Sequence, residues 1–127
     1  MDKEEFKRRT KAFAIQIGKF CKTVPHDQIV RYYIDQIVRS SASVGANYRA
    51  ACRAKSKPDF INKMRIVEEE ADETMYFLEL IYEFHPDKKE QIVILHKEAN
   101  ELLSMTISSI NTSLKTLKSK IANLKYE

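Results

Sequence analysis

The sequence predicts an all-α protein, an antiparallel up-down-up-down four-helix bundle with a long C-terminal helix. Only 2 Gly and 3 Pro occur among its 127 residues, and strands joined by many tight turns would need more of both. The three prolines, Pro25, Pro58 and Pro86, separate four long segments in which apolar residues recur at alternating steps of four and three. That repeat averages about 3.5 residues per turn, so it keeps one face of each helix against its neighbours. The length suits a single domain, 1–127.

The residues around the prolines set the expected helix limits. Proline is tolerated in the first turn of a helix and disrupts its interior, so we expect helices at about 3–24, 28–54, 57–84 and 88–124. Ser56 and Asp59 have the form of a capping box, and Asp87 and Glu90 repeat it before the last helix. Connections of about three to five residues then make neighbouring helices antiparallel.

The predicted core is the apolar stripe of each helix. The stripes are Phe6, Thr10, Phe13, Ile17, Phe20 and Val24; Val30, Ile34, Ile37, Ser41, Val44, Tyr48 and Ala51; Phe60, Met64, Val67, Ala71, Thr74, Leu78 and Ile81; and Ile110, Leu114, Leu117, Ile121 and Leu124. At about 1.5 Å per residue the first three helices span about 33–40 Å and the fourth about 55 Å. The last turns of the fourth, about Thr116 to Lys125, should therefore either project and pack on another subunit or bend.

The second helix carries small residues on the face opposite its core stripe. Exposed alanine is one explanation, because alanine is the best helix former; close packing of another helix is the other, and we favour a second protomer. Gly45 weakens a helix by about 1 kcal/mol relative to alanine, which close packing would offset. Beside this face, Ser43 and Asn47 are expected to make an interhelical hydrogen bond. The candidate interface residues are Ala42, Ser43, Ala46, Asn47, Ala50 and Ala54.

Charge is unevenly distributed along the chain, whose net charge is +4. The balance is +8 over residues 1–57, −6 over residues 58–83 and +2 over residues 84–127. Arg39, Arg49 and Arg53 fall within an arc of about 80° on the second helix, so they present one cationic strip. Such a strip attracts polyanions without base-specific contacts, and no aromatic residues interleave with the cations as stacking platforms would. Pairing with the acids of the third helix, Glu68 to Glu73, is the open alternative. The candidate nucleic-acid contacts are Arg39, Arg49, Arg53, Lys55 and Lys57, with Lys7, Arg8 and Arg9 as a second patch.

Several kinds of chemistry find no support in the sequence. A di-metal carboxylate site needs Glu-x-x-His on two helices, and none of the three histidines has a glutamate three residues before it. Cys21 and Cys52 have no zinc-ligand spacing, and two glycines cannot build a phosphate-binding loop. No apolar run approaches the ~18 residues of a membrane span, and no secretory signal is recognisable. We therefore expect a cytoplasmic protein that is not an enzyme, without cofactor, metal, membrane or small-molecule substrate.

The segment from Ile34 to Leu80 resembles a bacterial family, the 23S ribosomal RNA intervening-sequence proteins. The resemblance covers the second and third helices well, the first by pattern and the C-terminal end hardly at all. It implies a four-helix bundle that assembles into a ring, commonly a pentamer, and a relation to the basic, nucleic-acid-binding accessory variability proteins of diversity-generating retroelements. The residues that carry it are Gln36, Arg39, Ser43, Val44, Asn47, Ser56, Asp59 and Phe60, followed by the Glu-rich run Glu68–Glu70.

These observations together predict a homo-oligomeric accessory protein that binds RNA or DNA through its basic patches. The alternative is an oligomeric interaction scaffold whose charges serve subunit pairing and a protein partner.

Overall fold

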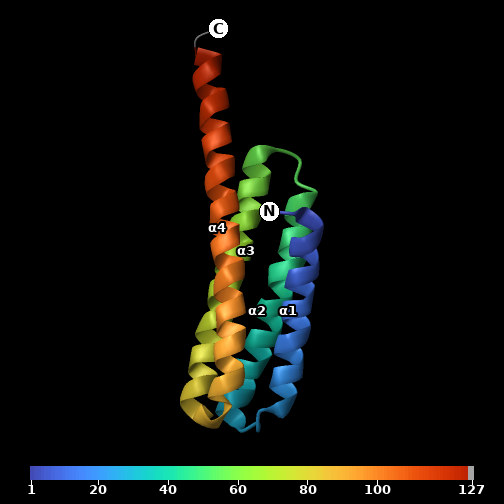
Figure 1. Cartoon of the computed structure of the whole chain (residues 1–127), viewed down its shortest axis with the longest axis vertical. Helices are drawn as coiled ribbons and strands as arrows, with labels where there is room; N and C mark the ends of the chain where they lie inside the picture. The colour runs from blue at the N-terminus through green and yellow to red at the C-terminus, as the bar shows by residue number, and fades with distance from the viewer. Residues whose placement is uncertain (126–127) are drawn as a thin grey trace.

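The computed structural model describes residues 1–125, and these form four long helices. They are α1 (Lys3–Thr23), α2 (Gln28–Cys52), α3 (Lys57–Phe84) and α4 (Lys89–Lys125), with one 3-10 turn, η1 (Pro86–Lys88), before α4. Each helix contacts two others in the cyclic order α1, α2, α3, α4, and Figure 1 shows them running alternately up and down. The four-helix bundle is confirmed, and the predicted helix limits agree with the observed ones to within two residues.

Side-chain caps explain three of the four helix starts. Asp2 accepts a hydrogen bond from the backbone N–H of Glu4, Asp27 accepts two at the start of α2, and Ser56 accepts one from Asp59. Each bond satisfies a backbone donor that has no partner within the helix. The cap predicted at Asp87 is wrong, because Pro86 starts η1 there and Asp87 lies inside that turn.

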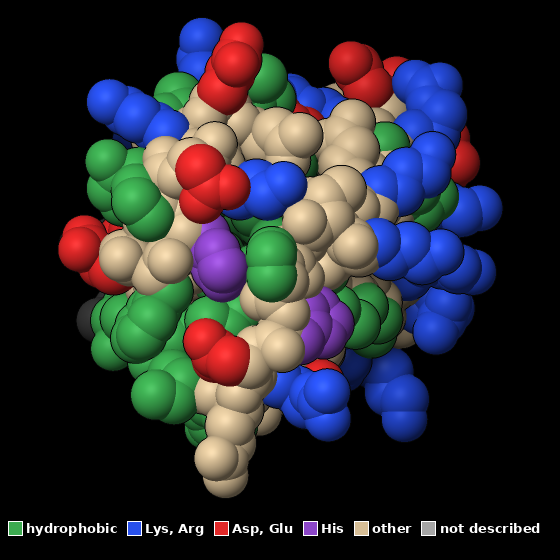
Figure 2. Space-filling model, turned by 90° about the horizontal axis from the view of Figure 1, so that it is seen from below, with side chains coloured by type: hydrophobic (Ala, Val, Ile, Leu, Met, Phe, Trp, Pro, Cys, Tyr) green, Lys and Arg blue, Asp and Glu red, His purple; other side chains and the backbone are tan. Residues whose placement is uncertain are grey.

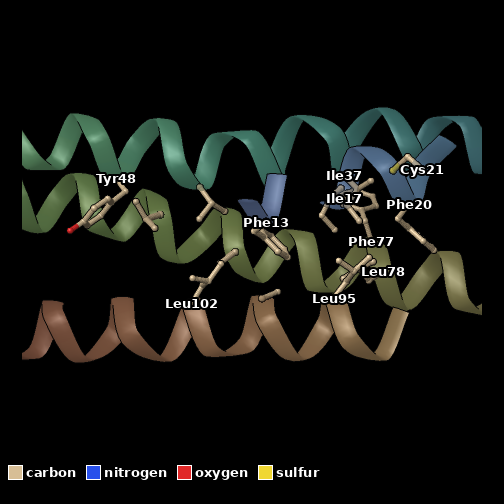
Figure 3. Packing of buried hydrophobic residues seen from close by; sticks show 14 of the residues in the cluster. Phe13, Ile17, Phe20, Cys21, Ile37, Tyr48, Phe77, Leu78, Leu95 and Leu102 are labelled. Atoms are coloured by element: carbon tan, nitrogen blue, oxygen red, sulfur yellow. The ribbon is translucent and has the colours of Figure 1, made fainter. Parts of the chain in front are cut away.

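The core contains most of the predicted stripes, and the first half of α4 adds Ile92, Leu95, Ala99 and Leu102, which the predicted stripes do not include. Every stripe position of α1 and α2 is buried, as is every one of α3 except the half-buried Phe60. Figure 3 shows the buried side chains of the four helices pointing toward one another, with Phe13, Ile37, Leu78 and Leu102 among them. Burial of this apolar surface supplies most of the driving force for folding.

The apolar stripe of α4 continues beyond the end of the other three helices. Ile110 is buried and Leu114 and Leu117 are half-buried, whereas Ile121 and Leu124 are exposed. Figure 1 shows α4 continuing as one helix well past the ends of the others. The predicted projection is therefore confirmed, and the helix does not bend back over the bundle.

Two close contacts set the register of α1 against α2. The Phe6 and Tyr48 rings meet edge to face with centroids 4.5 Å apart. One turn further along, Thr10 lies so close to Gly45 that a Cβ atom built on the glycine would be 3.0 Å from the Thr10 Oγ1 atom. Gly45 thus allows close packing inside the bundle. The start of α1 consequently lies beside the end of α2.

Candidate nucleic-acid interface

A groove runs between the first half of α1 and the second half of α2, with cations along its rim. Its volume is about 570 Å³. The floor is made of small residues, namely Ala14 of α1 and Ala42, Gly45 and Ala46 of α2. The charged residues that line it are Lys7, Arg8, Lys11 and Arg49, with Glu4 as the one carboxylate.

A second hollow, of about 350 Å³, lies at the same end of the bundle. Lys3, Lys55 and Lys57 surround it, and Cys52 and Phe60 contribute to its floor. The exposed Arg53 follows α2 directly and lies in the sequence between the two sets of cations. We call the whole set the basic surface, and it consists of Lys3, Lys7, Arg8, Lys11, Arg49, Arg53, Lys55 and Lys57.

The distribution of charge around the bundle is also one-sided. Figure 2 views the molecule from the end opposite the basic surface, and shows Lys and Arg side chains along the side where α1 lies. Hydrophobic side chains are exposed on the opposite side. A polyanion approaching the molecule would therefore be attracted to one side of it.

Arg39 lies apart from the basic surface and pairs with acids of α3, so its role as a nucleic-acid contact stays a prediction. Its Nη1 atom lies 3.1 Å from a carboxylate oxygen of Glu70, and its Nη2 atom donates to Glu73. The hydrogen bond to Glu73 is the main reason that the pKa of Arg39 is raised. Burial raises the pKa of Glu70, an effect larger than the opposing influence of Arg39. Arg39 therefore joins α2 to α3, as the alternative of pairing with third-helix acids predicts.

Arg9 likewise pairs with acids of a neighbouring helix, so its place in the second basic patch stays a prediction. Its guanidinium donates to both oxygens of Glu98, at 2.9 and 2.7 Å, and to Glu101 at 2.6 Å. The hydrogen bond to Glu98 is the largest of the influences that raise the pKa of Arg9. Because successive helical residues are rotated by about 100°, Arg8 faces the groove while Arg9 faces α4.

Comparison with known proteins agrees with this architecture. A family model described as "23S rRNA-intervening sequence protein" matches residues 3–108. The chain belongs to this family. A crystal structure of a protein of unknown function from the S23 ribosomal protein family of Bacteroides thetaiotaomicron is similar, with a TM-score of 0.75 and 36% sequence identity. The similarity covers 83% of this chain and 97% of that one. A comparison with curated proteins found no match.

Two cations of this intervening-sequence family member, Lys3 and Lys11, were not among the predicted contacts. The signal that points to them is the antiparallel pairing of α1 and α2, which places the first turns of α1 beside the last turns of α2. Of the predicted contacts, Lys7 also lies 3.6 Å from Glu4. Arg8, Arg49 and Arg53 are exposed and have no ion-pair partner within residues 1–125.

The small residues proposed as an oligomer interface are divided between two environments in this family member. Ala42 and Ala46 are exposed on the groove floor, whereas Ser43, Asn47, Ala50 and Ala54 are half-buried. The Asn47 side-chain amide donates to the Ser43 carbonyl oxygen at 2.9 Å, which is a bond within α2. Within one chain the amide therefore satisfies the backbone of its own helix, and the predicted interhelical bond to a second protomer stays a prediction.

Sequence-based expectations also concern metal-binding groups, the cysteines and hydrophobic helices. No three His, Cys, Asp or Glu residues lie close enough to hold a metal ion in residues 1–125. Burial raises the pKa of the Cys21 thiol to about 11, which suits a packing role. Over the same residues, no helix has both the length and the hydropathy that a bilayer crossing requires.

Proposed function

We propose that this intervening-sequence family protein is a homo-oligomeric accessory protein, not an enzyme, that binds structured RNA or another nucleic acid through its basic surface. The observation that carries the proposal is the groove between α1 and α2, where Lys7, Arg8, Lys11 and Arg49 surround a floor of small side chains. The name of the family, which refers to an intervening sequence of ribosomal RNA, supports RNA as the first ligand to test.

The groove is suited to a phosphate backbone. Its alanine and glycine floor presents no long side chain, so a sugar-phosphate strand could lie close to the helices while cations on the rim contact its phosphates. No Phe, Tyr or Trp lines it, so base stacking is not the expected mode of binding. Affinity should therefore depend on charge and shape, and should decrease with salt.

Assembly into a homo-oligomer, a ring and commonly a pentamer by family resemblance, is the second part of the proposal. The half-buried residues of the small face, Ser43, Asn47, Ala50 and Ala54, are where we place the contact. Several copies would bring several grooves to one nucleic acid, and multiple attachment raises apparent affinity without any new contact. We place the assembly in the cytoplasm.

A scaffold that binds another protein is the second candidate function. The ion pairs of Arg9 and Arg39 favour it, since they show that cations of this chain can serve helix pairing. Only the first candidate function predicts that the protein binds an isolated nucleic acid.

Titration of a structured RNA at several salt concentrations tests the proposal. In the variant Arg8→Gln/Lys11→Gln/Arg49→Gln, we expect the slope of log K against log salt to become shallower by about two to three. A control with the same change of charge, Lys22→Gln/Lys89→Gln/Lys97→Gln, removes exposed cations outside the basic surface and should change the slope less. Absence of binding at low salt, or equal slopes for the two variants, would leave only the scaffold.

A further inference from the structure

The free end of α4, residues 116–124, is an amphipathic helix. Leu117 at its start still packs on the edge of the core, whereas the residues after it have no neighbour in the bundle. Leu117, Ile121 and Leu124 continue the core stripe, and the last two are 49% and 69% exposed. Lys118 and Lys120 lie about 80° to either side of the centre of that stripe, at about 100° per residue. No carboxylate occurs in this segment, which we call the overhang. The family model ends at residue 108, so the overhang lies outside the matched region.

A second unpartnered apolar surface lies on α2 and α3. The Tyr32, Tyr76 and Phe84 side chains are 58%, 55% and 46% exposed. They pack on Tyr33 and Phe77, with ring centroids between 5.6 and 6.2 Å apart. We call these five residues the aromatic patch. Exposed apolar groups gathered in this way usually mark a binding surface.

Acidic residues accompany the aromatic patch. Glu69, Asp72 and Glu83 are exposed. Glu69 is seven residues before Tyr76, Asp72 is four before it and Glu83 is seven after it, so all three share its face of α3. None of the three forms an ion pair within residues 1–125. The patch therefore offers aromatic rings beside negative charge, whereas the overhang offers aliphatic side chains beside positive charge.

The two surfaces lie at opposite ends of the molecule. The patch joins the first turns of α2 to the last turns of α3, and the overhang extends past the other end of the bundle (Figure 1). Because the helices between them are rigid, one chain cannot bring its own overhang to its own patch. They can meet only between two copies.

We propose that the overhang of one copy binds the aromatic patch of a second copy. Ile121 and Leu124 would cover the exposed rings, and Lys118 and Lys120 would lie near the acids of α3. Two copies placed antiparallel make this contact twice, and the contact is separate from the one that we place at the small face of α2. Pairing of two overhangs would bring lysines together with no carboxylate between them. A nucleic acid would leave the aliphatic stripe uncovered, which makes a second copy the better partner.

Exchange of charge between the two surfaces tests the proposal. We expect Lys118→Glu/Lys120→Glu and Glu69→Lys/Glu83→Lys each to weaken self-association by about tenfold, measured by sedimentation velocity, because like charges then face each other. An equimolar mixture of the two variants should recover association, since overhang and patch are then opposite in charge again. Self-association that is unchanged in either variant alone, or that is not recovered when the two are mixed, would overturn the proposal.

A second variant separates this contact from nucleic-acid binding. Ile121→Gln/Leu124→Gln changes only exposed residues and keeps good helix propensity, so the bundle should remain folded. Self-association should weaken about tenfold or more, while affinity for RNA at the basic surface per chain should stay the same. Loss of RNA affinity with unchanged sedimentation would instead assign the overhang to nucleic acid. Failure of the RNA titration would leave the contact between copies standing, because the overhang and patch share no residue with the basic surface.

Discussion

The crossing of Thr10 and Gly45 shows how one residue controls the distance between two helices. Glycine in a helix interior lowers stability because its backbone is freer in the unfolded chain. At Gly45 that loss is offset by the approach of α1, whose Thr10 side chain occupies the space where a Cβ would lie. Gly18 is different. Apart from the backbone of its own helix, nothing lies within 4 Å of a Cβ atom built on it.

Alanine substitutions at the two glycines should therefore have opposite effects. Gly45→Ala should lower the free energy of unfolding by about 1 kcal/mol, because the strain against Thr10 exceeds the gain in helix propensity. Gly18→Ala should raise it by about 0.5–1 kcal/mol. Urea unfolding followed by circular dichroism measures both. Stabilisation by Gly45→Ala would mean that α1 moves away from α2 at little cost.

Asp59 links the loop before α3 to the first turns of that helix. Its carboxylate accepts a hydrogen bond from Lys63 Nζ at 2.6 Å and one from the backbone N–H of Lys55 at 3.0 Å. The pKa of Asp59 is consequently lowered below its ordinary value of 3.8, chiefly by the bond from Lys63. The carboxylate therefore stabilises the fold above pH 3.8, and this contribution disappears as the pH falls through the lower folded-state pKa.

The variant Asp59→Asn should melt at a lower temperature than the unmodified protein near neutral pH. The difference should shrink below pH 3.8, because protonation then removes the same charge from the unmodified protein. Thermal melts between neutral pH and pH ~2 measure this dependence. Asp35→Asn, at an exposed site on α2 without an ion pair within residues 1–125, is the control. A difference that persists at low pH would contradict the assignment.

At the scale of helices, Arg8 and Arg9 have different partners although they are adjacent in sequence. Arg9 connects α1 to α4, two helices that share less contact than any other neighbouring pair of long helices. Its hydrogen bonds to Glu98 and Glu101 are therefore an important part of how α1 is held. Arg8, by contrast, lines the groove between α1 and α2.

Glutamine substitutions should separate the two roles. Arg9→Gln should lower the free energy of unfolding by about 1–2 kcal/mol, since it leaves Glu98 and Glu101 without their shared cation. Arg8→Gln should change stability by less than about 0.5 kcal/mol and should weaken binding of RNA. Chemical unfolding and an RNA titration of both variants provide the measurements. A stability loss confined to Arg8→Gln would contradict the geometry.

The same pair of residues shows what the sequence can and cannot predict. The repeat of Phe6, Thr10, Phe13 and Ile17 identifies the buried face of α1 because burial follows from periodicity within one helix. It does not say which neighbour approaches each flank, so Arg8 and Arg9 could not be distinguished. Lys3 and Lys11 are absent from the predicted contacts for a related reason. The position of Lys11 beside Arg49, and that of Lys3 beside Lys55 and Lys57, depend on how α1 and α2 pair. Asp87 was misassigned because a proline turn and a capping box look alike in sequence.

At the scale of the whole molecule, the segregation of charge along the chain becomes a segregation in space. The acids of α3 partly neutralise Arg39 and leave Glu69, Asp72 and Glu83 exposed on one face. The cations of α1 and the end of α2 gather elsewhere, so the small net charge of +4 hides two surfaces of opposite sign. Net charge alone would not have indicated either the nucleic-acid proposal or the contact between copies.

The limited contact between α1 and α4 has a consequence for how this molecule would respond to a ligand. Of the four helices, α1 has the fewest contacts with the rest of the bundle, and a helix with few contacts tends to detach first in local opening. This same helix carries half of the basic surface. A polyanion that bridged α1 and α2 would bind only the closed form, and mass action would then favour closure. Occupancy of the groove should thus protect the backbone amides of α1 from hydrogen exchange, including those far from any phosphate.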